Sequence, residues 1–203
     1  MALSNEQWNA PPAGGGGFYG HQIASSLRNS ATQDGTLKLS AGTPSSADKM
    51  TLSFWVKRLS LADDQNIFVA GTGGASYFFM AFAGGGVLHV EGIGGTFGTS
   101  GNTNYLLSTA KFRDLSAFYH IVLRIDSTQG TGSNRVRVYI NGEHLTAYSN
   151  STLHSHGQGT DFNFINADGV VQSFGGLSGS GHGTEGADLQ MAEIVFTDGQ
   201  SLG

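Results

Sequence analysis

Residues 50–57 read Met-Thr-Leu-Ser-Phe-Trp-Val-Lys, and apolar side chains alternate with others along the stretch. Because successive side chains of a β-strand point to opposite faces, Leu52, Phe54 and Val56 are predicted to share one buried face. Trp55 falls on the opposite face. It is either a solvent-facing aromatic ring able to stack on a sugar or a side chain packed beneath a loop. The stretch therefore predicts a half-buried strand.

The segments that follow repeat this strand pattern. Residues 119–125 and 135–140 alternate in the same way, and Asn141-Gly142 supplies the two positive-φ residues of a type I′ hairpin turn. Residues 77–83 are apolar on both faces, which predicts a central strand covered on each side. No long window has the 3.6-residue period of a helix. The pattern predicts an antiparallel β-sandwich or barrel.

The predicted core consists of apolar residues that share strand faces: Leu52, Phe54, Val56, Phe79, Ile121, Leu123, Val136, Val138, Ile140, Ile194 and Phe196.

Composition excludes several classes of protein. The chain has 203 residues, with 10 Lys+Arg against 15 Asp+Glu and no Cys. Nucleic-acid binding is not expected, since phosphate contacts need clustered basic side chains. The absence of Cys excludes disulfide scaffolds, zinc fingers and thiol nucleophiles. No apolar run approaches the ~20 residues that cross a bilayer, and the N-terminus lacks the pattern of a signal peptide, so no membrane insertion is expected.

The chain divides into two parts of unlike composition. Residues 1–17 contain Pro11-Pro12 and the glycine run 14–17, which suit neither a helix nor a central strand. This N-terminal arm is either a disordered leader or a segment that orders against a partner. Residues 18–203 are predicted to form the sandwich domain.

No catalytic residue is predicted. The best carboxylate candidates for glycoside hydrolysis are Glu185, Asp188 and Glu193, but their spacing prevents one strand from presenting all three on one face. No nucleophile elbow or phosphate-binding loop occurs.

Polar and aromatic residues of the C-terminal loops are the candidate ligand-binding groups. They are Tyr148, His154, His156, Asp161, Asn163 and His182.

Metal binding is a weaker alternative for the same loops. His154 and His156 have strand-like spacing for zinc, but we favour the interpretation that they are exposed polar residues in Gly/Ser-rich loops. Asp161, Asn166 and Asp168 could supply oxygen ligands to calcium, although Asp and Asn in turns usually bond their own backbone. We expect no metal or other cofactor, with calcium as the one possibility.

Several ordered motifs resemble one family. Residues 51–58 (TLSFWVKR) and 118–129 (FYHIVLRIDSTQ) are similar to strands of a phage-encoded branch of the concanavalin A-like lectin/glucanase superfamily, of the laminin-G/pentraxin type. Residues 133–142 (SNRVRVYING) resemble its hairpin, residues 191–202 (MAEIVFTDGQSL) its last strand, and residues 22–28 (QIASSLR) its entry. The family usually has Trp where this chain has Phe118.

The resemblance implies a jelly-roll of two antiparallel sheets and a place in the virion, in a tail fibre, a spike or a head decoration. The implied task is attachment to glycans of the host surface, with the N-terminal arm docking the domain to other virion proteins. No catalytic activity is expected, because the sequence lacks the carboxylate motif of enzymatic members. A homo-oligomer is expected. The alternatives are a purely structural decoration or tail adaptor without sugar binding and, further off, a polysaccharide depolymerase.

Overall fold

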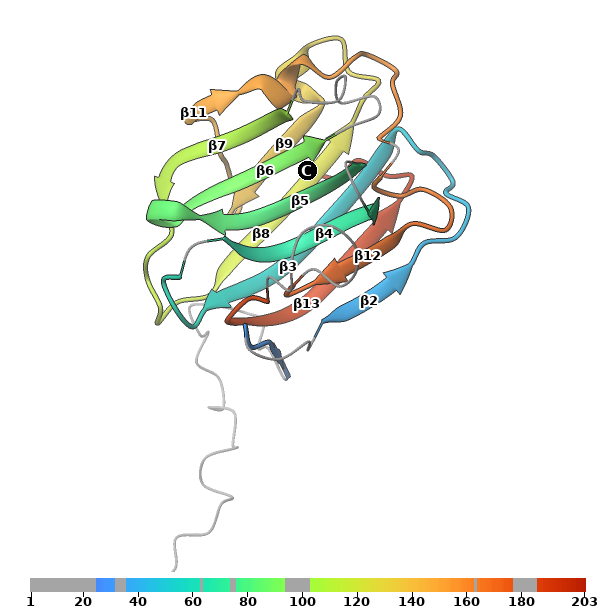
Figure 1. The fold of residues 1–203 in the computed structure, drawn as a ribbon. Helices are drawn as coiled ribbons and strands as arrows, with labels where there is room; N and C mark the ends of the chain where they lie inside the picture. The colour runs from blue at the N-terminus through green and yellow to red at the C-terminus, as the bar shows by residue number, and fades with distance from the viewer. Residues whose placement is uncertain are drawn as a thin grey trace, which may run out of the picture.

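The computed structural model describes residues 25–31, 36–62, 64–73, 76–93, 103–162, 164–176 and 186–203. Two antiparallel sheets pack face to face (Figure 1), which confirms the predicted sandwich. The predicted arm, residues 1–17, lies outside the described residues. In the part of the chain that is described, no helix is long and apolar enough to cross a membrane. Among the described residues, three short 3₁₀ turns cover residues 84–86, 132–134 and 152–155.

One sheet has six strands. In spatial order they are β1 (Leu27–Arg28), β13 (Leu189–Asp198), β3 (Lys49–Arg58), β8 (Tyr119–Asp126), β9 (Val136–Ile140) and β10 (Glu143–His144).

The other sheet has seven strands and faces the viewer in Figure 1. In spatial order they are β11 (Tyr148–Ser151), β7 (Thr103–Lys111), β6 (Val87–Ile93), β5 (Ser76–Ala83), β4 (Gln65–Gly73), β12 (Val171–Phe174) and β2 (Leu37–Ser40).

The core between the sheets matches most of the prediction. Leu52, Phe54 and Val56 are fully buried, as are the predicted residues of β8 and β9 apart from Ile140, which packs partly buried at the margin. The prediction that Phe79 belongs to the core was wrong. Phe78, Met80 and Phe82 fill the core from β5, so Phe79 points to the outer face. An apolar run on both faces hides which set of side chains is inward.

A β-bulge in β13 changes which of its side chains face the core. The pairing with β3 shifts between Ala192 and Val195, and Glu193 has φ 51°. Met191 is inward before the bulge, and Ile194 and Phe196 pack against the core after it. An unbroken alternation would put Ala192 on the same face as Ile194. Because of the bulge, Ala192 instead pairs with the outward-facing Trp55.

The predicted hairpin is confirmed. Asn141 and Gly142 have φ 52° and 85°, and Glu143 pairs with Ile140 across the turn. His120 donates its backbone N–H to Asn141 Oδ1 at 2.9 Å, which ties the turn to β8.

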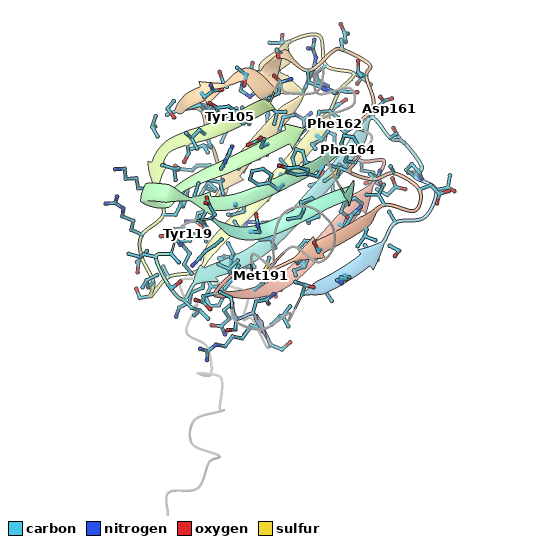
Figure 2. The ribbon with its side chains drawn as sticks, viewed as in Figure 1. Tyr105, Tyr119, Asp161, Phe162, Phe164 and Met191 are labelled. Carbon is cyan, nitrogen blue, oxygen red and sulfur yellow. The ribbon has the colours of Figure 1, made fainter. Side chains whose placement is uncertain are left out.

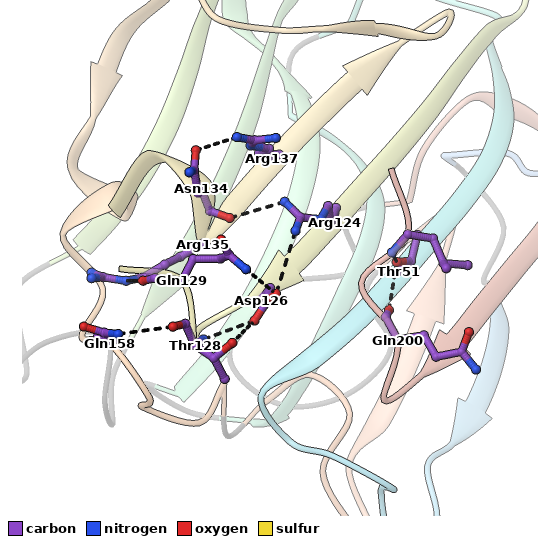
Figure 3. A network of polar contacts seen from close by, with 11 residues as sticks. Thr51, Arg124, Asp126, Thr128, Gln129, Asn134, Arg135, Arg137, Gln158 and Gln200 are labelled. Atoms are coloured by element: carbon purple, nitrogen blue, oxygen red, sulfur yellow. Dashed lines mark hydrogen bonds and ion pairs between the residues drawn. The ribbon is translucent and has the colours of Figure 1, made fainter. Parts of the chain in front are cut away.

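A polar network closes the loop between β8 and β9 (Figure 3). Asp126 accepts hydrogen bonds from the hydroxyl of Thr128 and, at 2.8 Å, from Gln129 Nε2. Burial of Asp126 works against its ionisation, but these bonds outweigh it and hold its pKa below the usual value. Arg135 donates to the carbonyl oxygens of Gln129, Gly130 and His156, so this loop is fastened to the loop that follows β11.

Candidate functional site

Aromatic side chains gather on the outer face of the seven-stranded sheet, on three neighbouring strands. Tyr77 and Phe79 come from β5, His89 from β6 and Tyr105 from β7 (Figure 2 labels Tyr105). We call these four residues the aromatic row. Their adjacency follows from antiparallel register, since Phe79 pairs with Glu91, and Glu91 pairs in turn with Tyr105.

The rings of the aromatic row contact one another in sequence. Ring centroids are 5.8 Å apart for Tyr77 and Phe79, 5.0 Å for Phe79 and His89, and 5.3 Å for His89 and Tyr105. The first pair is stacked and the other two meet edge to face, both favourable aromatic geometries. All four side chains are partly buried, so the row is held in place yet keeps some surface open to solvent.

Glu91 lies within the aromatic row and is 8% exposed. Its Oε2 is 2.8 Å from His89 Nε2, a distance that joins an acceptor to a possible donor on the same strand. The site thus combines ring surfaces with one carboxylate and one imidazole. This combination suits a polyhydroxylated ligand, because C–H faces stack on rings and hydroxyl groups bond to polar side chains.

Sequence reasoning missed this site. The alternation over residues 87–91 already places His89 and Glu91 on one face, which was the available signal. It did not identify Phe79 or Tyr105 as neighbours, because the register between strands depends on turn geometry and packing that no motif encodes.

Two of the predicted ligand-binding residues come together elsewhere. Tyr148, on the edge strand β11, meets His154 edge to face at 5.6 Å. Burial raises the pKa of the Tyr148 hydroxyl and lowers the pKa of His154, an effect that a hydrogen bond with Val136 partly offsets. The His154 ring is partly exposed, so this pair stays a candidate contact for a ligand.

His156 lies inside the protein, with 2% of its surface exposed. Its ring packs on Phe162 at 3.9 Å, and Nε2 is 2.9 Å from the carbonyl oxygen of Thr160. Burial lowers the pKa of His156, so the neutral ring is favoured. The contacts fit a residue that holds the loop together.

Asp161 lies at the surface near Phe162 and Phe164, at one end of the sandwich (Figure 2). Its pKa is raised, first by loss of solvent and then by the hydrogen bond and charge of Asp48. Asn163 and His182 lie outside the described residues.

The calcium candidates Asn166 and Asp168 have different surroundings. Asn166 is buried and donates from Nδ2 to Ser46 O at 3.0 Å and to Asp198 Oδ1 at 2.5 Å, whereas Asp168 is exposed. Within the described ranges, no three His, Asp or Glu side chains form a group that could hold a metal ion. Calcium binding here stays a prediction.

The carboxylates considered for catalysis have separate surroundings. Asp188 Oδ1 accepts the backbone N–H of Ala31 at 2.9 Å, which fastens β1 to the start of β13. Glu193 is exposed at the β13 bulge. Glu185 lies outside the described residues. Trp55 is partly buried on the outer face of the six-stranded sheet, with its ring 4.9 Å from that of His120.

Comparison with known proteins gives the same picture of the fold. The family model of the concanavalin A-like lectin/glucanases superfamily matches residues 31–178. No curated protein matches the sequence.

Solved structures of similar fold include a heptameric pentraxin from Limulus polyphemus, at 15% identity and TM-score 0.54 over 84% of this chain and 74% of that one. Domains LG4–5 of the mouse laminin α1 chain match at 12% identity and TM-score 0.59, over 89% of this chain and 45% of theirs. Domain 4 of the arabinanase AbnA from Geobacillus stearothermophilus, in complex with arabinotriose, matches at 17% identity and TM-score 0.50, over 82% and 68%. At these identities the likeness is one of fold.

Proposed function

The chain belongs to the concanavalin A-like lectin/glucanase superfamily, and from this we propose that it is a carbohydrate-binding protein whose glycan ligand lies across the aromatic row. The observation that carries the proposal is the row itself. Three strands present rings in mutual contact on one sheet face, with Glu91 and His89 among them.

The physical argument is one of preorganisation. The rings pack against one another and stand on central strands, so little side-chain freedom remains to be lost when a ligand binds. Glu91 and His89 place a carboxylate and an imidazole beside the rings, and groups of these kinds bond to sugar hydroxyls. The complex of the arabinanase domain with arabinotriose supports the proposal, because it is an example of this fold with an oligosaccharide.

We infer binding without hydrolysis. Glycoside hydrolysis ordinarily uses two carboxyl groups, roughly 5–9.5 Å apart, on either side of the scissile bond. In the described strands of the seven-stranded sheet, Glu91 is the only acidic residue. A second carboxylate is therefore missing from the strands that carry the row.

A glycan array with the purified protein, followed by titration of each positive glycan, tests the proposal. Tyr105→Ala removes one ring of the row and is expected to weaken binding about two- to twelvefold, since losing an aromatic contact costs ~0.5–1.5 kcal/mol. Tyr139→Ala is the matched control, because Tyr139 also contacts a histidine ring, His144 at 5.2 Å, but on the six-stranded sheet.

If the Tyr105→Ala variant and the parent protein bind with equal affinity, the ligand does not bind on the aromatic row. His154→Ala then decides whether the Tyr148–His154 pair binds it instead. An array without any positive glycan would contradict the proposed function altogether.

We propose further that the domain serves attachment in a phage virion, with the N-terminal arm joining it to other virion proteins and a symmetric homo-oligomer as the working form. The support is the sequence resemblance of residues 51–58, 118–129, 133–142 and 191–202 to phage-encoded domains. Cryo-electron microscopy of the particle tests this. Density at the tail tip with the aromatic row open to solvent agrees with attachment, whereas a capsid position with the row covered by other subunits favours a purely structural role.

A further inference from the structure

Two arginine side chains line one pocket at an end of the sandwich. The pocket has a volume of about 240 Å³ and is bounded by Arg58, Leu61, Gly85, Gly86 and Arg113. These residues come from the end of β3, the turn between β5 and β6, and the segment after β7. The pocket is therefore separate from the aromatic row and from the loop that holds His154.

Arg58 is held rigidly in the wall of the pocket. It is fully buried, and its Nη1 and Nη2 donate to the carbonyl oxygens of Phe112 and Ala62 at 2.8 and 3.0 Å. Its guanidinium lies over the Phe82 ring, 4.9 Å from the centroid. A charge fixed in this way needs no reorganisation to interact with an anion in the pocket.

Arg113 reaches the same space from the surface. Its Nε donates to the carbonyl oxygen of Gly85 at 3.1 Å, and no other hydrogen bond to it occurs among the described residues. The neighbouring carboxylate of Asp114 accepts from the backbone N–H and hydroxyl of Ser116. The two terminal nitrogens of Arg113 thus keep donors for a ligand.

Gly86 lies between the two arginine side chains, which both approach it closely. A Cβ atom at this position would lie 3.3 Å from Arg58 Nη1 and 3.5 Å from Arg113 Nε. Both guanidinium groups therefore carry their positive charges beside the same pocket. An anion placed there interacts favourably with both.

We propose that this pocket binds the carboxylate of an acidic sugar residue. The inference deepens the proposed function, because it assigns the glycan an acidic residue. An arginine presents a planar fork of donors that matches the two oxygens of a carboxylate. The volume lies below the ~300–1,000 Å³ of pockets for drug-sized ligands, so it suits the acidic end of one sugar residue.

Isothermal titration of the purified protein with free glucuronate and with free N-acetylneuraminate tests the pocket, and glucose is the neutral comparison. Both acids are expected to bind, and to bind more weakly as the salt concentration rises, whereas glucose is not expected to bind. Arg113→Gln is expected to weaken acid binding at least tenfold, and Arg113→Lys to weaken it less. Arg28→Gln, an exposed arginine on β1, is the matched control and should change nothing.

The possible results separate the two proposals. Glycan binding that depends on Tyr105 but shows no preference for acidic sugars overturns the pocket and leaves the proposed function intact. Acid binding that Arg113→Gln leaves unchanged also overturns the pocket. If acid binding is lost in Arg113→Gln, the proposed pocket is supported even when no array glycan requires Tyr105. In that case the proposal that the glycan lies on the aromatic row is wrong, while the proposal for the pocket is supported.

Discussion

His156 shows how one side chain can fasten a loop to the core. The ring packs on Phe162, Nε2 reaches the carbonyl oxygen of Thr160, and the carbonyl oxygen of His156 accepts from Arg135. The loop between β11 and β12 is thereby tied to the loop between β8 and β9. These contacts assign His156 a structural part, whatever the neighbouring His154 binds.

Replacing His156 with Ala is expected to lower the free energy of unfolding by about 2–4 kcal/mol, because it leaves a cavity and removes a buried polar contact. Urea denaturation followed by tryptophan fluorescence measures the change. His144→Ala is the control, since His144 is exposed, and it should cost less than about 1 kcal/mol. A loss no greater than that of the control would contradict the structural part.

The same residue predicts a dependence of stability on pH. Burial lowers the pKa of His156 in the folded protein below the ordinary histidine value of about 6.5, which the unfolded chain keeps. As the pH falls below about 6.5, the unfolded chain therefore binds a proton first, and stability decreases. Urea denaturation at pH 7.5 and 5.5 should show this decrease, and His156→Gln should make it smaller. An identical decrease in the variant would assign the effect to other groups.

The turn between β9 and β10 depends on backbone conformation alone at one position. Gly142 has φ +85°, and a Cβ atom there would meet nothing within 4 Å. Gly142→Ala is therefore expected to cost about 1–2 kcal/mol through the left-handed conformation without any steric clash. Gly130→Ala is the matched control, because its Cβ also meets nothing and its φ is not positive in that range. Equal free energies of unfolding for the two variants would refute this explanation.

Several strands were predictable because they have a local signal. The alternation of residues 50–57 and the Asn141-Gly142 pair depend on neighbouring residues only, and both are confirmed. Phe79 was assigned to the wrong face, and an unbroken alternation along β13 would also misplace Ala192, for different reasons. The first lies in a strand that is apolar on both faces, and the second precedes a bulge that adds one residue to β13. Neither choice can be read from the strand's own residues.

The candidate site was less predictable than the fold. The predicted ligand groups lie in polar loops, where composition gives a signal, and the structure brings together Tyr148 and His154 but places His156 in the interior. The aromatic row is spread over three strands, and its members become neighbours only through strand register. Long-range pairing of this kind is a property of the assembled sheet.

At one end of the sandwich the charged side chain of Arg58 connects the two sheets, in addition to the apolar packing between them. Arg58 ends β3 of the six-stranded sheet, yet it donates to Phe112, which follows β7, and lies over Phe82 of β5. Both of these contacts belong to the side of the seven-stranded sheet. A flexible ammonium group cannot reproduce the fork of donors that reaches Phe112 and Ala62 together.

Arg58→Lys is therefore expected to lower the free energy of unfolding by about 1.5–3 kcal/mol, since hydrogen bonds to charged groups contribute ~1.5–3 kcal/mol each and one of the two is lost. The loss should appear in a single cooperative transition, because the contact joins the sheets and both depend on it. Urea denaturation followed by fluorescence and by far-UV circular dichroism measures it, with the exposed Arg28→Lys as control. If the two signals separate in Arg58→Lys, the sheets unfold independently once the link is weakened. If Arg58→Lys is as stable as the control, packing alone holds the sheets together and the buried arginine serves the pocket instead.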